Sequence, residues 1–549
     1  MLPGDSTGLG GGLLVFERCN IEPSFLGQSS VWGLLPPLVA IGLAIVTRRV
    51  VVSLIAGVFL AALILEAGNP LVAMVTAGRS FFWPSLFDFD HLKVFAFTLM
   101  MGAMVGVVGR TGGIRVIVTE FIRRTSSRRS GQLATWGMGL LIFFDDYANT
   151  MLLGTTMQPL TDRLKISREK LAYIVDSTAA PVAGLALVST WVAGEIGYID
   201  DGLKGLRFVG ETPGGMQLFL STIPYRFYVL WSLVMVAFVA LSNRDFGAML
   251  RVERHAWIHG LDVVHKDHTD STLLANEVLR WESAILPLIV TILTICGVLG
   301  VTGWSASVEQ GDSLSWMSLI GNSNSYSALV YGALAGLVTA SVTAVMLSQI
   351  AWSEVISAAH RGCAMMIPCL AILWTAWSLS MATGKNYLGT GHYLGSLIQN
   401  ELPIAWLPTI VFLLSAMVSF STGTSWGTMA LLMPQVIPVV HQMLAIKSGG
   451  VLATDPILIA TTGSVLAGAI FGDHCSPISD TTVLSSQASG CDLMDHVRTQ
   501  LPYAAVIALI SVVFGTLPVG FGWNVWVCLP LGIAAIIVWL QVFGRRVDE

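Results

Sequence analysis

Long apolar stretches recur along the whole chain, and they limit its possible folds more than any other feature. A helix needs about 17 to 25 apolar residues to cross the roughly 30 Å hydrocarbon core of a bilayer. Only 11% of the 549 residues are charged, against roughly 25% in soluble domains, so a soluble surface could not be covered. We therefore expect an all-α polytopic membrane protein in contact with the lipid bilayer. Its eleven expected crossings lie at about 31–47, 50–67, 92–109, 171–192, 224–241, 283–301, 325–348, 363–383, 457–471, 501–520 and 523–543.

Composition and motifs exclude several other classes. The net charge of −5 argues against a nucleic-acid partner, which requires a concentrated basic face. The seven cysteines form no C-x-x-C pair, so we expect neither structural zinc nor a disulfide framework. No phosphate-binding loop of the G-x-x-x-x-G-K-[ST] type is present, which excludes that form of ATP-driven pump. Residues 1–30 lack the pattern of a cleavable signal peptide, and we expect no cofactor.

Two shorter apolar stretches, 131–144 and 147–160, enclose a polar tip. The tip, residues 145–150, reads Asp-Asp-Tyr-Ala-Asn-Thr. Because Lys and Arg concentrate in cytoplasmic loops, two basic flanks indicate that both ends of the pair lie on the cytoplasmic side. The pair is then a re-entrant hairpin whose tip reaches the middle of the membrane. Its flanks carry Arg110, Arg115, Arg123, Arg124, Arg128 and Arg129 before it, and Arg163, Lys165, Arg168 and Lys170 after it.

A second pair, 404–420 and 428–446, encloses residues 421–426, Ser-Thr-Gly-Thr-Ser-Trp. Its flanks carry almost no basic charge, so we expect it to enter from outside. This threading, with the N-terminus outside and the C-terminus cytoplasmic in a bacterial inner membrane, places 21 Lys and Arg on the cytoplasmic side and 8 outside. That asymmetry agrees with the positive-inside rule. The stretch 71–82 remains as a partial helix that does not cross.

The threading predicts two inverted repeats, each of five transmembrane helices plus a re-entrant hairpin, with one extra C-terminal helix. An odd number of crossings inverts the second repeat, as in many secondary transporters. A faint echo agrees: an offset of 296 residues pairs Pro181 with Pro477. The expected units are an N-terminal extension (1–30), a first repeat (31–241) with its hairpin near 131–160, a charged cytoplasmic linker (242–282), a second repeat (283–520) with its hairpin near 404–446, and an extra helix and tail (521–549).

Four polar segments interrupt the apolar pattern. Their expected position deep in the membrane implies a function. Carboxylates in hydrocarbon are costly and normally face a cavity, a partner or an ion. Pro181 and Pro477 break helices and free backbone carbonyls, which together with side-chain oxygens suit Na⁺. The candidate ion-binding residues are Asp145, Asp146, Asn149, Thr150, Asp176, Ser177, Thr178, Thr422, Thr424, Ser425, Asp473, His474, Ser476, Ser479, Asp480 and Thr481. Among them, Asp146, Asp176 and Asp480 are the candidate Na⁺ carboxylates.

Three of these segments carry a family resemblance. Residues 471–482 read Phe-Gly-Asp-His-Cys-Ser-Pro-Ile-Ser-Asp-Thr-Thr, and with 143–150 and 176–181 they resemble the NhaC-type sodium/proton antiporter family over roughly residues 90–500. The resemblance implies the ion-transporter-superfamily fold, with paired hairpins, broken helices and a substrate site between them. It also implies exchange of sodium for protons, whereas related branches exchange carboxylates or amino acids. It marks motif positions without assigning a role to each.

Each candidate also has an ordinary structural interpretation. Asp145 and Asp146 could cap a helix at the interface, residues 472–482 could form a cytoplasmic turn, and the 421–425 hydroxyls could pack helices. His474 could carry protons or make a structural hydrogen bond. Glu195 could be an exposed interfacial acid or a proton-handling group, so we leave it outside the core site. Histidines 255, 259, 265 and 268 lie in the charged linker, where a solvated face is favoured over a metal site.

The sequence favours a Na⁺/H⁺ antiporter in which carboxylates are shared between Na⁺ and H⁺. The alternative is a sodium- or proton-coupled exchanger or carrier of a small organic anion or amino acid on the same scaffold. An intramembrane enzyme is disfavoured, because the adjacent Asp145 and Asp146 point in different directions and make a poor catalytic pair. A channel fits carboxylates at helix breaks less well than alternating access. A homodimer, the solute and the stoichiometry stay open.

Overall fold

The computed structural model describes residues 31–47, 49–114, 116–117, 125–210, 212–260, 280–310, 319, 323–384, 386–390, 393 and 402–548. Over these ranges the chain is almost entirely helical, and its one strand pair joins β1 (Arg244–Asp245) to β2 (Arg545–Arg546). Within the same ranges, nine helices are long and apolar enough to cross a membrane, or up to 11 if each bent pair counts as one span. The expected class of helical membrane protein is confirmed.

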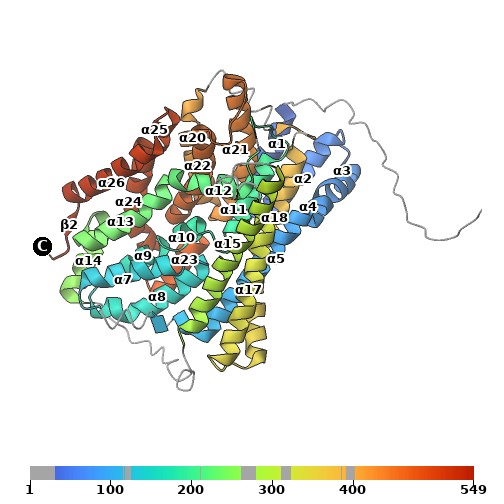
Figure 1. The fold of residues 1–549 in the computed structure, drawn as a ribbon. Helices are drawn as coiled ribbons and strands as arrows, with labels where there is room; N and C mark the ends of the chain where they lie inside the picture. The colour runs from blue at the N-terminus through green and yellow to red at the C-terminus, as the bar shows by residue number, and fades with distance from the viewer. Residues whose placement is uncertain are drawn as a thin grey trace, which may run out of the picture.

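One side of the molecule is a bundle that we call the flanking bundle (Figure 1). Small residues let two of its helices approach closely, as is common in membrane bundles: a Cβ atom at Gly362 would lie 2.0 Å from the Gly102 carbonyl oxygen. The helix expected over 71–82 is present as the segment Pro70–Phe87, which is bent by 116° from the preceding helix. The bundle comprises α1 (Leu35–Thr47), α2 (Val50–Leu65), α3 (Pro70–Thr76), η2 (Ala77–Phe82), α4 (Trp83–Phe87), α5 (Phe89–Thr111), α15 (Glu282–Gln310), α17 (Ser325–Met346) and α18 (Trp352–Thr383).

The remaining helices form a second unit, the hairpin bundle. Its two helix pairs stand where the sequence predicts them. They are α7 (Arg128–Leu141) with α8 (Asp146–Arg163), and η5 (Ile404–Trp406) and α20 (Leu407–Thr422) with α21 (Ser425–Ser448). By length and composition α20 and α21 each could span a bilayer, whereas α7 and α8 are not among the candidate spans. Re-entrance of the pairs and the two inverted repeats therefore stay predictions.

Two of the expected crossings are broken helices. The crossing expected at 171–192 divides into α9 (Arg168–Asp176) and α10 (Ala180–Leu185), and a further helix, α11 (Val192–Leu203), follows where the sequence predicted no crossing. The crossing expected at 457–471 is α22 (Pro456–Cys475), which stops before Pro477 and continues after a break as α23 (Asp480–Ser489). Proline lacks the backbone donor that a continuous helix requires. Both helices are thus interrupted at the polar motifs.

The hairpin bundle is completed by helices from both halves of the chain, and Figure 1 shows α13, α24 and α26 side by side. A bend of 48° separates the segment Gly215–Tyr225 from α13. These elements are α12 (Gly215–Thr222), η3 (Ile223–Tyr225), α13 (Phe227–Ser242), α24 (Leu493–Ile510), η6 (Ser511–Thr516), α25 (Leu517–Gly520) and α26 (Val525–Val542).

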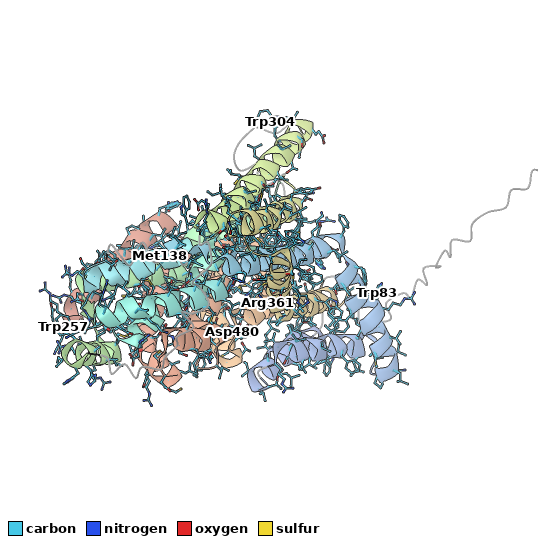
Figure 2. The ribbon with its side chains drawn as sticks, turned by 90° about the horizontal axis from the view of Figure 1, so that it is seen from below. Trp83, Met138, Trp257, Trp304, Arg361 and Asp480 are labelled. Atoms are coloured by element: carbon cyan, nitrogen blue, oxygen red, sulfur yellow. The ribbon has the colours of Figure 1, made fainter. Side chains whose placement is uncertain are left out.

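The first part of the charged linker packs against the base of the first hairpin. Its helix α14 (Gly247–His259) carries Glu253, which is buried, accepts the Ser167 backbone N–H at 2.7 Å and pairs with Arg128. Figure 2 shows Trp257 of α14 at the outer edge of the hairpin bundle, away from Trp83 of the flanking bundle. This segment is therefore docked, and only part of it faces solvent.

The linker histidines are consistent with a solvated face where they are described. His255 and His259 are exposed on α14, with their ring centroids 4.8 Å apart. His265 and His268 lie outside the described residues.

The structure offers two sharp reporters for the predicted side of the first hairpin. Ser126 and Lys165, at its two ends, are exposed. In a cysteine-free background, we predict that Ser126→Cys and Lys165→Cys resist a membrane-impermeant thiol reagent in intact cells, because their basic flanks hold them in the cytoplasm. Both should react in inverted membrane vesicles.

The matched control is Lys447→Cys, which is exposed at the end of the second hairpin and should react in intact cells. Labelling of only one first-hairpin site from outside would show that the hairpin crosses the membrane, and labelling of both would reverse the orientation.

Candidate functional site

The two hairpin tips meet the two helix breaks. At the second tip, Gly423 has a φ of +70° and a Cβ atom there would lie 2.7 Å from the Ile478 carbonyl oxygen in the α22–α23 break. At the first tip, the Asn149 amide donates to the carbonyls of Gly139 at 2.7 Å, Ile142 at 3.0 Å and Thr178 at 3.1 Å. Thr178 lies in the α9–α10 break, so the Asn149 amide fixes that break against the hairpin.

Asp473, in the last turn of α22, faces the second tip. Its Oδ2 accepts hydrogen bonds from the Ser425 hydroxyl at 3.2 Å and the Thr481 hydroxyl at 3.4 Å. Its Oδ1 is buried and has no hydrogen-bond partner among the described residues. The neighbouring Ser476 hydroxyl donates to the Phe420 carbonyl at 2.8 Å, which holds the break against α20. Asp473 is therefore fixed by one oxygen and open at the other.

Asp480 begins α23 and lies beside the first tip. It is exposed, in contrast to Asp473. One carboxylate oxygen accepts the Thr481 N–H at 2.9 Å and the other accepts the Tyr147 hydroxyl. Ser479 caps the same helix, with its hydroxyl 3.1 Å from that of Thr481. Asp480 thus joins the first hairpin to the α22–α23 break while its side chain stays exposed.

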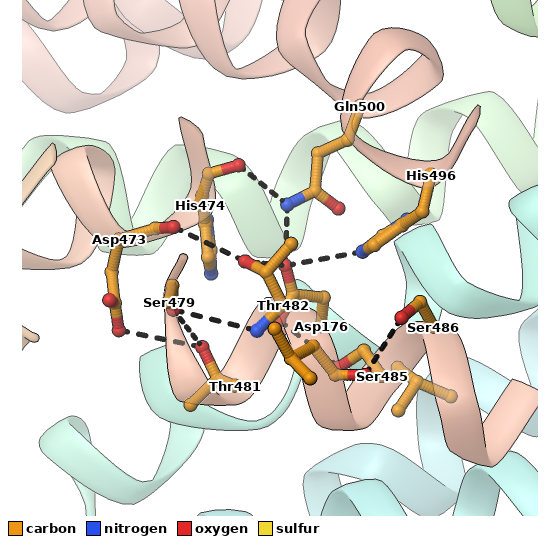
Figure 3. A network of polar contacts seen from close by, with 12 residues as sticks. Asp176, Asp473, His474, Ser479, Thr481, Thr482, Ser485, Ser486, His496 and Gln500 are labelled. Carbon is orange, nitrogen blue, oxygen red and sulfur yellow. Dashed lines mark hydrogen bonds and ion pairs between the residues drawn. The ribbon is translucent and has the colours of Figure 1, made fainter. Parts of the chain in front are cut away.

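Asp176, at the end of α9, is the centre of a buried polar network (Figure 3). It accepts hydrogen bonds from the Gln500 amide, from Ser485 at 3.1 Å and from Thr482 at 3.4 Å. The His496 ring nitrogen lies 3.6 Å from the same carboxylate. Both oxygens are engaged by α23 and α24, so Asp176 connects the first half of the chain to the second.

The first tip also contains two adjacent aspartates. Asp145 caps α8 through the Ala148 N–H at 2.8 Å and accepts the Thr190 hydroxyl at 2.9 Å. Asp146 is buried in the first turn of α8. The Asn149 Oδ1 and Thr150 Oγ1 atoms on the same helix are buried, and within the described chain neither has a hydrogen-bond partner. The capping role expected as an alternative is real for Asp145, although the residue is buried.

Several other predicted residues satisfy their own helices. The Thr422 hydroxyl donates to the Val418 carbonyl at 2.9 Å, and Thr178 donates to Ile174 at 2.8 Å. Thr424 caps α21 by accepting the Gly427 N–H at 3.3 Å. Ser177 is buried in the α9–α10 break. Thr422, Thr178 and Thr424 thus shape the tips and the break through local hydrogen bonds, and the ion-binding role of all four residues stays a prediction.

His474 sits between the two aspartates of Figure 3. Its Nδ1 lies 3.0 Å from the Tyr228 hydroxyl, and its carbonyl oxygen accepts the Gln500 amide at 2.9 Å. The structural hydrogen bond that the sequence left open is therefore present.

Sequence analysis did not select six residues that contact the predicted aspartates: Tyr147, Thr190, Thr482, Ser485, His496 and Gln500. His496 and Gln500 are four residues apart and share one face of α24, but Asp495, Arg498 and Thr499 lie among them, so no separate polar face points to a buried partner. The partner itself lies far away in sequence, which periodicity cannot reveal.

The charge balance of the site is unusual. Within the described part of the chain, the only ion pair made by Asp145, Asp146, Asp176, Asp473 or Asp480 is that of Asp176 with His496. Buried carboxylates without cationic partners are stabilised by hydrogen bonds, by protonation or by a bound cation. The same ranges contain no cluster of three or more His, Cys, Asp or Glu side chains arranged for a metal ion. The site therefore offers oxygen ligands of the kind that a hard monovalent cation or a proton can use.

Comparison with known proteins gives a consistent picture. A protein of Haemophilus influenzae with the name "Uncharacterized protein" is 34% identical over 500 residues, which cover 90% of this chain and 92% of that protein. The Na⁺/H⁺ antiporter NhaC of Alkalihalophilus pseudofirmus is 31% identical over 114 residues, 20% of this chain and 22% of its own. The malate-2H⁺/Na⁺-lactate antiporter of Bacillus subtilis is 38% identical over 114 residues, 19% and 22% of the two chains.

A solved structure and a protein-family model also match this chain. The crystal structure of the Alcanivorax borkumensis YdaH transporter superposes with a TM-score of 0.54 at 14% identity, covering 82% of this chain and 90% of that one. A model of the Na⁺/H⁺ antiporter family matches residues 182–520, more than half of the chain. The predicted resemblance is confirmed: this integral membrane protein belongs to the Na⁺/H⁺ antiporter family.

Proposed function

We propose that the chain exchanges Na⁺ for H⁺ through carboxylates at the junction of the hairpin tips and helix breaks. The observation that carries this proposal is a set of buried oxygens with unused lone pairs. Asp473 Oδ1, Asn149 Oδ1 and Thr150 Oγ1 have no hydrogen-bond partner within the described residues. A buried polar atom without a partner costs free energy, and a cation that coordinates these oxygens would remove that cost. Side-chain and backbone oxygens are the ligands that hard cations prefer.

Exchange follows from competition for the same carboxylates. A proton on a carboxyl group removes the charge that attracts Na⁺, so the two ions exclude each other. Lower pH therefore weakens Na⁺ binding and higher pH strengthens it. Among the three carboxylates selected from the sequence, we assign this role to Asp146 and Asp480, and we add Asp473. Asp176, whose two oxygens are already engaged, acts in this proposal by positioning α23 and α24.

Alternating access would come from movement of the hairpin bundle against the flanking bundle. An apolar cavity of about 180 Å³ lies between them, lined by Ile142 and Phe143, between α7 and the first tip, and by Leu288 and Ile289 of α15, among others. Apolar surfaces make no directional bonds that would have to break during sliding. Transport of unequal charge would add about 2.3 kcal/mol per charge per 100 mV of membrane potential. We place the chain in a bacterial inner membrane with its C-terminus in the cytoplasm.

A second candidate function is coupled exchange of a small organic anion or amino acid. The malate-2H⁺/Na⁺-lactate antiporter that matches part of this chain shows that a related segment occurs in a protein named for organic anions. In this chain, Thr424 and Ser425 place hydroxyls at the N-terminus of α21, where partial positive charge favours a carboxylate. A proton-flux assay in proteoliposomes distinguishes the two functions, with Na⁺ alone compared with Na⁺ plus malate, lactate or amino acids.

The carboxylates can be tested by proton release. We predict that adding Na⁺ to the detergent-solubilised protein in weak buffer releases protons, because Na⁺ displaces them from shared carboxyl groups. Asp473→Asn and Asp480→Asn should each reduce this release strongly, since an amide cannot titrate. A pH-sensitive dye gives the measurement.

The control for these variants is Asp162→Asn, at the base of the first hairpin. Asp162 is an ion-paired carboxylate of α8, 2.6 Å from Arg168 and partly exposed, and its loss should leave proton release unchanged. If Asp473→Asn and Asp480→Asn, both folded, released protons and exchanged ions as the unsubstituted protein does, the assignment would be wrong.

The second tip can be tested through one hydroxyl. We predict that Ser425→Ala raises the apparent Km for Na⁺ by roughly tenfold, because a hydrogen bond to a charged group contributes about 1.5 to 3 kcal/mol. Ser421→Ala is the matched control, since the Ser421 hydroxyl is exposed and bonds only its own helix, at Met417. Equal Km values for the two variants would return this tip to a packing role. The measurement is Na⁺-dependent proton flux in proteoliposomes.

A further inference from the structure

A buried ion pair lies outside the site described above. Glu195 of α11 and Arg226, just before α13, are joined at 2.9 Å, and their side chains are 2% and 1% exposed. Glu195 is therefore not the exposed interfacial acid that the sequence allowed. The guanidinium of Arg226 also donates to the Gly184 carbonyl at 2.5 Å and to the Thr222 hydroxyl at 3.0 Å. One side chain thus contacts the end of α10, the start of α11 and the end of α12.

Residues 186–191, which we call the α10–α11 connection, join one short helix to the next. The Ser189 hydroxyl donates to the Ala183 carbonyl at 2.7 Å and accepts the backbone N–H groups of Trp191 and Val192 at 3.2 Å each. The α10–α11 connection therefore has a defined conformation. It contains little regular secondary structure, so its position depends on the contacts that fix its two ends.

The α10–α11 connection contacts both hairpin tips. The Thr190 N–H donates to the Phe144 carbonyl at 3.0 Å, and the Thr190 hydroxyl donates to Asp145 at 2.9 Å. The ring of Trp191 lies 5.4 Å from that of Trp426, the last residue of the second tip. A displacement of residues 186–191 would therefore move two groups together: Thr190, which donates a hydrogen bond to Asp145, and Trp191, which contacts the second tip.

We propose that the Glu195–Arg226 pair is a positioning device that fixes residues 186–191 and thereby sets the geometry of both hairpin tips. Glu195 is in the first turn of α11 and Gly184 is in the last turn of α10. A carboxylate at a helix N-terminus and a cation at a helix C-terminus both interact favourably with the helix dipole. The pair therefore holds together the C-terminus of α10 and the N-terminus of α11, which flank the α10–α11 connection.

A role in stability alone does not account for this arrangement. A buried ion pair costs so much desolvation energy that well-packed apolar residues of similar size often replace it without loss of stability. Arg226 Nη2 and both carboxylate oxygens of Glu195 also lack a hydrogen bond of good geometry among the described residues, so the pair is held by charge and is not optimised as a stabilising element. What apolar residues cannot reproduce is the directed contact of one group with Glu195, Gly184 and Thr222.

The test replaces both charges at once, in Glu195→Leu/Arg226→Met. We expect this variant to fold, with little change in its thermal unfolding, and to raise the apparent Km for Na⁺ roughly tenfold with a smaller effect on maximal rate. A second readout needs no transport. Leu187, in the α10–α11 connection, is 46% exposed. In a cysteine-free background, Leu187→Cys should react with a thiol reagent at least threefold faster in the double variant than in the unsubstituted protein.

The matched control is Lys170→Met/Asp245→Asn, which removes another buried ion pair of the hairpin bundle. Its side chains are 1% and 2% exposed, and Asp245 bonds Tyr503 rather than residues 186–191. This control should leave the Na⁺ Km and the Leu187→Cys labelling unchanged. If Glu195→Leu/Arg226→Met does not fold, Arg226→Lys keeps the charge but cannot reach Gly184 and Thr222 together, and it should give the same two shifts.

Wild-type labelling and Km in the folded double variant, or in Arg226→Lys, would overturn the proposal. The Km readout rests on the proposed Na⁺/H⁺ exchange, whereas the labelling readout does not. Absence of Na⁺-dependent flux in the unsubstituted protein, with faster labelling in the variant, would therefore refute the exchange function and leave the positioning role supported.

Discussion

Burying ionised carboxylates within an apolar helix bundle is costly, because water can no longer solvate them. This chain places four buried aspartates and one exposed aspartate at its first hairpin tip and its two helix breaks. A break supplies the hydroxyls and N–H groups that a continuous helix would use internally. Asp473 receives Ser425 and Thr481, and Asp145 receives Ala148 and Thr190. The discontinuous helices, which would be a defect in a purely structural membrane bundle, make the carboxylates tolerable.

The site also binds the two halves of the chain into one unit. Asp176, from the first half, is hydrogen-bonded by Thr482, Ser485 and Gln500 from the second. Tyr147, at the tip of the first hairpin, reaches Asp480 at the break of α22 and α23. Neither half contains a complete set of partners for its own carboxylates. The complete polar network therefore requires both halves of the chain packed together.

The sequence predicted the helical membrane class, both helix pairs and the break before Pro477, because apolar length and proline act locally. It also located the central aspartates, since charged residues inside apolar stretches need no partner information to be conspicuous. It missed α11, whose Glu195, Asp200 and Asp201 make the segment resemble a loop. It placed α14 in a solvated linker, because the burial of Glu253 depends on Arg128 and Ser167, more than 80 residues away. Gln500 was missed for the same reason.

The contacts of each carboxylate separate two kinds of aspartate that look alike in the sequence. Asp145 and Asp176 have their oxygens engaged by fixed donors, so a bound ion would have to displace a hydrogen bond that shapes the fold. Among the described residues, Asp473 keeps one oxygen without a hydrogen-bond partner. Asp480 has both oxygens engaged, but it differs from the buried aspartates because its side chain is exposed. An exchanging ion must bind and leave repeatedly, which favours ligands whose release does not unfold their surroundings. In the proposed exchange, the buried and fully hydrogen-bonded Asp145 and Asp176 therefore suit the role of framework, and Asp473, with its unengaged oxygen, and the exposed Asp480 suit the role of exchangeable ligands.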